Sequence, residues 1–183
     1  MGYVVDIQCF KRPYNEFVIK ELAILPLQQD AHPLVYLFEP PYAWSRLPAR
    51  YKCENRWLTN NYHGIDWAAG DVSYEKLQPI IKEVLIGTPT IYVKGLEKQK
   101  WLEKYTSNVF NLDDFKCPSL KSFSVESSST CTNHTRSFSN CAVKNVCNLR
   151  NWLIQPSNVL RNNIENNDEV DNDCTLKDFY NDC

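Results

Sequence analysis

The sequence lacks three features that would place the protein in a membrane, in the secretory pathway or on duplex nucleic acid. No stretch is long and apolar enough to span a bilayer. The opening MGYVVDIQCFKRPY has no charged n-region, apolar core or small-residue cleavage site of a signal peptide. Lys and Arg number 20 against 22 Asp and Glu, so composition announces no broad basic face. We therefore expect an intracellular protein of the cytoplasm or nucleus, with no membrane contact.

What the sequence does contain is enough apolar material for one folded domain. Its 183 residues are 43% hydrophobic and 13% aromatic, which suits a packed globule. From residue 156 on, Asn and acidic residues dominate, a composition that buries little apolar surface. We predict a domain over residues 1–155 and a largely flexible C-terminal tail over residues 156–183.

Local periodicity predicts a mixed α/β order. Apolar, β-branched runs predict strands at 3–10, 17–27, 34–38, 90–94 and 108–112. Helical spacing predicts helices at 72–85, 96–105 and 141–154. Pro26 should break or bulge the second strand, and Asp71 is a candidate cap for the first helix. We assign neither helix nor strand to the aromatic and basic segment 42–61. Strands followed by alternating helices and strands indicate a mixed sheet flanked by helices.

The sharpest local signal is Cys131-x-x-His134 followed by Cys141 at the start of a predicted helix. In a reducing compartment, clustered Cys and His indicate a metal site more often than a disulfide. Thiolate and imidazole are the donors that zinc prefers, and it takes four. Spacing leaves the fourth donor open between Cys147, Cys117 and a carboxylate from elsewhere. The competing interpretation is that Cys131 and Cys141 are small buried hydrophobic residues. Beyond the open position of Cys147 as a fourth donor, no role is assigned to Cys147, Cys174 or Cys183.

The order of elements resembles the DEDDh-type exonucleases, which have an RNase H-like fold. Asp6 stands at the first catalytic position of that pattern, but Gln8 stands where a Glu is expected. Lys98 falls about where the third carboxylate would be, and Asn140 and Asn145 about where the final His and Asp would be. A lysine and neutral amides do not hold two divalent cations, so the sequence argues against two-metal nuclease chemistry.

A closer resemblance is to the Maelstrom domain, a degenerate exonuclease-like domain marked by Glu, Cys, His and Cys. Its positions match Glu21 in KELAI, then Cys131, His134 and Cys141. The resemblance implies one structural zinc ion, single-stranded RNA binding with weak ribonuclease activity independent of metal, and silencing-pathway proteins as partners. It implies a role in small-RNA silencing of transposons, or an origin in a transposon, and no small-molecule cofactor.

RNA contacts are expected where aromatic and basic residues interleave, because rings stack on bases and cations hold phosphates. The candidates are Arg46, Arg50, Lys52, Arg56, Trp57, Lys94, Lys98 and Lys100. The alternative is that the aromatic residues are core and the basic side chains point outward. The catalytic residues are unknown; His63, Lys94, Lys98 and Arg136 are guesses. A second function class is a non-catalytic protein-interaction module that keeps only the fold.

Overall fold

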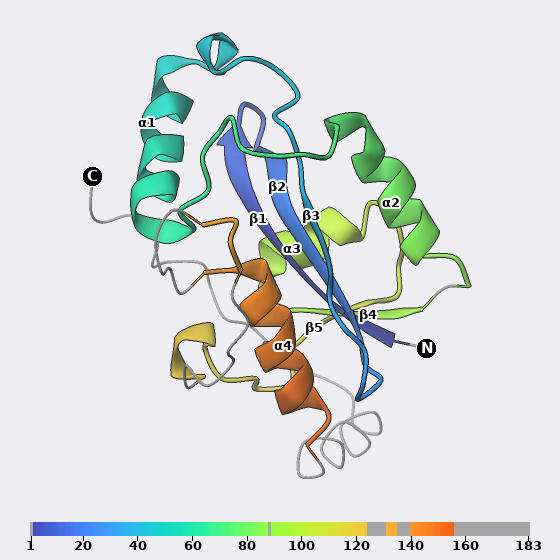
Figure 1. Ribbon diagram of the computed structural model, residues 1–183. Helices are drawn as coiled ribbons and strands as arrows, with labels where there is room; N and C mark the ends of the chain where they lie inside the picture. The colour runs from blue at the N-terminus through green and yellow to red at the C-terminus, as the bar shows by residue number, and fades with distance from the viewer. Residues whose placement is uncertain (1, 88, 124–130, 135–139, 156–183) are drawn as a thin grey trace.

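The computed structural model describes residues 2–87, 89–123, 131–134 and 140–155. These residues form an α/β structure around a five-stranded mixed sheet in the order β3-β2-β1-β4-β5 (Figure 1). The strands are β1 (Gly2–Arg12), β2 (Glu16–Pro26), β3 (Leu34–Leu37), β4 (Thr90–Val93) and β5 (Val109–Asn111). The first three form an antiparallel meander, and β4 and β5 run parallel to β1. The five predicted strands are therefore confirmed, each with small differences in its ends.

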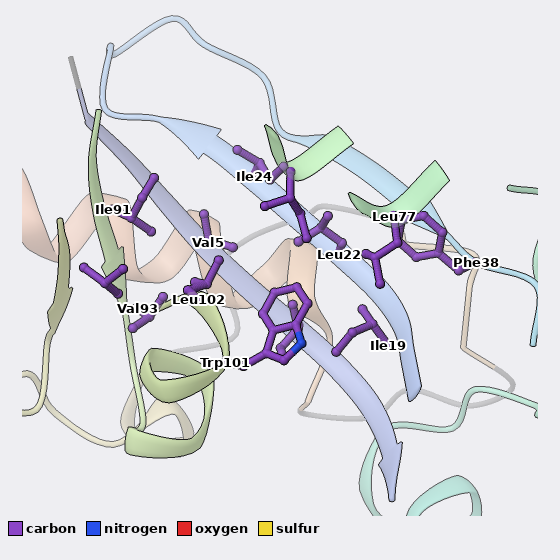
Figure 2. Packing of buried hydrophobic residues seen from close by; sticks show 13 residues of the cluster. Val5, Ile19, Leu22, Ile24, Phe38, Leu77, Ile91, Val93, Trp101 and Leu102 are labelled. Atoms are coloured by element: carbon purple, nitrogen blue, oxygen red, sulfur yellow. The ribbon is translucent and has the colours of Figure 1, made fainter. Parts of the chain in front are cut away.

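The two central strands are long because both of their faces are covered. Val5, Leu22 and Ile24 pack with α2 (Leu77–Val84) and α3 (Leu96–Leu102), as Figure 2 shows. Val4 and Ala23 alternate with them and pack with α4 (Ala142–Leu153) on the opposite face. This two-sided burial explains the nearly continuous apolar runs of both strands. The face of β1 and β2 that carries Val4 and Ala23 therefore points its side chains toward α4.

A bulge in β2 occurs at Lys20, where the pairing with β1 changes from Gln8–Glu21 to Cys9–Ile19. The bulge was expected at Pro26, which instead is the last residue of the strand. Lys20 is the extra residue, and its backbone carbonyl accepts from the Phe38 amide at 2.8 Å. One inserted residue reverses the side-chain alternation beyond it, so Glu21 faces α4 while Ile19 faces the α2–α3 core.

The helices depart from the sequence prediction in two places. The predicted helix 72–85 is a 3-10 turn at Tyr74–Lys76 followed by α2, and no side-chain cap bond is made at either start. Asp71 therefore does not cap it; the Asp71 amide instead donates to the carbonyl of Leu37, the last residue of β3. Pro79 is tolerated because it lies in the first turn of α2, where its missing N–H is not needed.

Helix α1 (Ala49–Trp57) was not predicted; it lies in the segment 42–61 and continues into a π-helical turn at Leu58–Tyr62. The helices α3 and α4 were predicted and are present. Among the described residues no helix is long and apolar enough to cross a membrane. The predicted tail, with Cys174 and Cys183, and the residue Arg136 lie outside the described residues. The six described cysteines are free thiols: Cys9, Cys53, Cys117, Cys131, Cys141 and Cys147.

Candidate metal centre

Four side chains from three separate parts of the chain meet beside the first turn of α4. Glu21, Cys131, His134 and Cys141 each offer one ligand atom, and these atoms lie within 4.8 Å of one another. Glu21 comes from β2, Cys131 and His134 from the segment before α4, and Cys141 is the N-cap residue of α4. Spacing in the sequence marked three of these residues and the resemblance to the Maelstrom domain implied Glu21; together the four could hold a metal ion.

Glu21 is the residue that joins this group to the sheet. Its side chain is fully buried, and its two carboxylate oxygens have different partners. Oε2 accepts from the Ala142 backbone amide at 2.8 Å, at the positive end of the α4 dipole. Oε1 lies 3.4 Å from both Cys131 Sγ and His134 Nε2, and accepts from Asn133 Nδ2 at 3.1 Å. One oxygen therefore stabilises the helix end while the other faces the three partner ligands.

The ring of His134 is oriented so that its Nε2 atom faces the group. His134 Nδ1 bonds to the backbone carbonyl of His63, and a carbonyl can only accept, so Nδ1 carries the proton. In the neutral ring Nε2 then carries no proton, and its lone pair is available to a metal ion. This nitrogen is buried without a hydrogen-bond partner among the described residues. Such a carbonyl-bound imidazole is the usual arrangement of a metal-ligating histidine.

The donor set fits a zinc ion. Zinc binds Cys, His and carboxylate ligands at about 2.0–2.3 Å, so the edges of a tetrahedral site measure about 3.3–3.8 Å. The two contacts of Glu21 Oε1, to Cys131 Sγ and His134 Nε2, are both 3.4 Å long and already have this size. No separation among the four ligand atoms exceeds 4.8 Å, so a side-chain movement of about 1 Å brings them all to tetrahedral edges.

Electrostatics also favour negative charge at this place. Burial by itself raises the pKa of Glu21, but His134, the Ala142 amide and Asn133 outweigh it and hold the pKa below its ordinary value. The neighbouring Cys131 thiol lowers the pKa of Cys141, helped by backbone amides at the start of α4 and opposed by burial. The same contact between the two thiols, together with burial, raises the pKa of Cys131, so the shifts favour a negative charge on Glu21 and on one of the two sulfurs, where a divalent cation would neutralise it.

A proton is the competing occupant of this pocket. Burial lowers the pKa of His134, but contacts with Cys131 and Glu21 outweigh it and raise the pKa to about 10 when no metal is bound. An imidazolium at His134 would face Glu21 across the 3.4 Å contact. The proton and the metal compete for the same Nε2 lone pair, so metal content distinguishes the two states.

The other two cysteines considered as fourth ligands lie outside the group. Cys147 is six residues beyond Cys141 on α4, which places it roughly 9 Å along the helix and on another side. Cys147 and Cys117 both pack in the apolar cluster beneath α4. Asn133 and the carbonyl of His63 are supporting groups that sequence reasoning missed, because neither a lone Asn nor a backbone oxygen has a sequence signature.

The candidate RNA-contacting residues divide into two sets. Four of the basic side chains are bound within the protein: Arg50 pairs with Glu54, Lys52 donates to Ser45 O, Lys94 bonds to Asp113 and Cys117 O, and Lys98 pairs with Asp6. Lys94 and Lys98 therefore each have a carboxylate partner within the protein, and their contact with RNA stays a prediction. Arg46, Arg56 and Lys100 are exposed, and their side chains make no ion pair or hydrogen bond within the described part of the chain.

The aromatic residues of the same segment divide in a similar way. Trp44 and Tyr51 pack with Phe10 and Trp67 in an apolar cluster beneath α1, so the core interpretation holds for them. Trp57, at the end of α1, exposes 56% of its surface. The core interpretation therefore does not hold for Trp57.

The structure also brings together the residues matched to exonuclease carboxylates. Gln8, Lys98 and Asn145 all bond to Asp6, and Asn140 donates to Tyr62 O at 3.2 Å. With a lysine bound to the one remaining carboxylate, this place holds no pair of hard cations.

No protein-family model matches the chain, and no curated protein matches it either.

Proposed function

We propose that the chain is a zinc-stabilised domain of RNase H-like fold, related to the Maelstrom domain, that binds single-stranded RNA. The observation that carries this proposal is the meeting of Glu21 with Cys131, His134 and Cys141 across more than 100 residues of sequence. A chance set of buried cysteines has no reason to converge on a buried carboxylate. The five-stranded sheet with an antiparallel meander and parallel β4 and β5 is compatible with the RNase H-like fold.

The zinc ion would be structural rather than catalytic. Four protein donors complete a tetrahedral shell and leave no position for a reacting water. Glu21 is fully buried and the His134 side chain is 5% exposed, which leaves little access for a substrate. The ion would tie β2 and the segment 131–134 to the start of α4, and its binding would contribute directly to folding.

Metal content of the purified chain tests the site. We expect one zinc ion per chain by elemental mass spectrometry, lost in Glu21→Ala and in Cys141→Ser. Cys147→Ser is the matched control, since this thiol lies on the same helix outside the group, and it should keep the zinc. Well-folded wild-type protein without zinc, or loss of zinc in the control alone, would refute the site.

Support for RNA as the ligand comes from the surface around the end of α1. Trp57 is 56% exposed next to the unpaired and exposed Arg56, and Tyr62, in the following turn, is 38% exposed. Arg56, Trp57 and Tyr62 thus place a cation and two partly exposed rings close together in sequence, the combination that holds phosphates and stacks on bases. A stacked base contributes about 1–3 kcal/mol, and the sequence tolerance of stacking suits a single strand.

Binding of a fluorescent single-stranded RNA, measured by anisotropy over a range of salt, tests this part. We expect Trp57→Ala to weaken binding roughly 5- to 150-fold. Arg56→Ala should reduce the salt slope by about 0.7, the value for one phosphate contact on a single strand. Lys82→Ala, an exposed lysine on α2, is the control and should change neither. Zinc-loaded protein without salt-dependent RNA binding would favour the protein-interaction module instead.

A further inference from the structure

The turn at the end of α1 is bonded to both segments that carry the cysteine and histidine ligands. His134 Nδ1 donates to the backbone carbonyl of His63. Asn140, which directly precedes the ligand Cys141, donates from Nδ2 to the carbonyl of Tyr62 at 3.2 Å. Figure 1 shows the end of α1 beside the orange segment that leads into α4. Two consecutive backbone carbonyls of the turn are therefore held from the metal centre.

This turn has an uncommon backbone, and the helix before it has little apolar anchorage. The turn is π-helical over Leu58–Tyr62, and the His63 amide closes it by donating to Leu58 O at 3.0 Å. Single π-helical turns are rare and occur often at functional sites. The one buried residue of α1 is Asn55, whose side chain bonds to the Lys11 backbone at 2.8 Å. Hydrogen bonds, more than apolar burial, therefore anchor the helix and its last turn.

The side chains proposed to bind RNA are placed by the same turn. Arg56 and Trp57 are the last two residues of α1, and Tyr62 is the last residue of the π-helical turn. Within the turn, Asn61 Nδ2 donates to Trp57 O at 3.1 Å. Fixing the Tyr62 carbonyl therefore also fixes the relative positions of the two exposed rings. A surface ordered before RNA arrives avoids the cost of ordering it on binding.

Zinc would hold the segment that bonds to this turn. Residues 131–134 form neither helix nor strand, so their position depends on the ligand group. A zinc ion ties all four ligands to one point, whereas a proton on His134 Nε2 joins that ring to Glu21 alone. A cation on Nε2 also draws electron density from the imidazole and makes Nδ1–H a stronger donor to the His63 carbonyl.

We propose that the zinc centre positions the turn that carries Arg56, Trp57 and Tyr62, so that zinc and RNA each strengthen the binding of the other. Asn140 and His134 are the positioning residues that connect the two sites. This inference rests on the proposed function, because it concerns regulation of the same RNA surface by the same metal. Linkage makes the effect mutual: zinc raises RNA affinity and RNA raises zinc affinity by the same factor.

Asn140→Ala tests the connection without touching the metal site, since it keeps all four ligands. It should retain one zinc ion per chain, while hydrogen exchange followed by mass spectrometry shows faster exchange over residues 58–63 than in wild type. Its affinity for a fluorescent single-stranded RNA should be roughly 2- to 10-fold weaker, the effect of one hydrogen bond. Asn151→Ala is the matched control: it removes an exposed amide side chain from α4 and should behave like wild type.

The mutual effect is measured by competition for zinc between the full chain and a chromophoric chelator. Saturating RNA should raise the zinc affinity of wild type by about 5- to 150-fold, and by less in Asn140→Ala. A purely structural role of Asn140 would lower stability without changing this ratio. If Asn140→Ala does not fold, the wild-type ratio decides alone, and a ratio of one would overturn the proposal.

The outcomes separate this inference from the proposed function. A chain that binds zinc and RNA independently, with unchanged exchange over residues 58–63 in Asn140→Ala, would overturn the inference and leave the proposed function intact. Absence of zinc from well-folded wild type would refute both. A zinc-loaded chain that binds no RNA would refute RNA as the ligand. Exchange over residues 58–63 with and without zinc then decides whether the centre positions the turn, and equal exchange would overturn that.

Discussion

Lys20 holds the bulge of β2 to two other parts of the chain, and its removal has a calculable effect. The residue is fully buried, and Nζ donates to the carbonyl oxygens of Phe38 at 2.6 Å, of Trp67 at 2.9 Å and of Ala69. Lys20→Met keeps most of the apolar stem but leaves two buried carbonyls and one partly buried carbonyl without this donor. A hydrogen bond to a charged group contributes about 1.5–3 kcal/mol, and relief of the buried charge offsets part of the loss. We expect the free energy of unfolding to fall by about 3–5 kcal/mol.

Urea denaturation followed by tryptophan fluorescence and circular dichroism measures this change. The control is Lys82→Met, which makes the same substitution at an exposed position of α2 and should stay within about 0.5 kcal/mol of wild type. A loss below about 1 kcal/mol in Lys20→Met would refute the reasoning. It would mean that water or other groups satisfy the three carbonyls and that the bulge is held without the ammonium.

Three further predictions concern the same framework. Burial lowers the pKa of His63 from 6.5 to about 4, so the unfolded chain binds more protons than the folded chain between these two pH values. Wild type should therefore lose roughly 3 kcal/mol of its free energy of unfolding on acidification from pH 6.5 to 4. His63→Gln, which has no imidazole to protonate, should lose less. Tyr74→Phe removes the oxygen that accepts from the Ile19 amide at 3.1 Å and should cost about 1–2 kcal/mol in urea denaturation; no loss would show that another acceptor replaces it. At Gly70, φ is +132° and an added Cβ would lie 2.4 Å from backbone atoms of Phe38, so Gly70→Ala should cost more than about 2 kcal/mol; an unchanged melting temperature would contradict this packing.

Much of the fold was accessible from local pattern. The strands and the helices α3 and α4 have apolar spacing that only one regular structure explains, and they are where the pattern predicted them. Helix α1 was missed because its residues are mixed aromatic and charged. Only one residue of this helix, Asn55, is buried, and that side chain bonds to the Lys11 backbone rather than joining an apolar stripe.

Three of the four candidate ligands were also recognisable, since Cys131, His134 and Cys141 stand close together in sequence. Spacing could not identify the fourth ligand, and the resemblance to the Maelstrom domain supplied Glu21. Only the tertiary structure shows why Glu21 fits: it shares the face of β2 with Ala23, which packs with α4, and its carboxylate reaches the Ala142 amide at the start of that helix. A carboxylate on a strand looks the same in sequence whether it is solvated or buried.

The chain's own pattern thus determined the α/β order of elements and the cluster of thiol and imidazole donors, because both depend on residues near one another in sequence. The tertiary structure decided which charges are available. It bound Lys98 to Asp6 and Lys94 to Asp113, and it left Arg56 and Trp57 exposed. Charge availability depends on partners far apart in sequence, brought together by the packing of α3 and α4 on the central strands. No local signal distinguishes a lysine that will bind a ligand from one that neutralises a buried carboxylate.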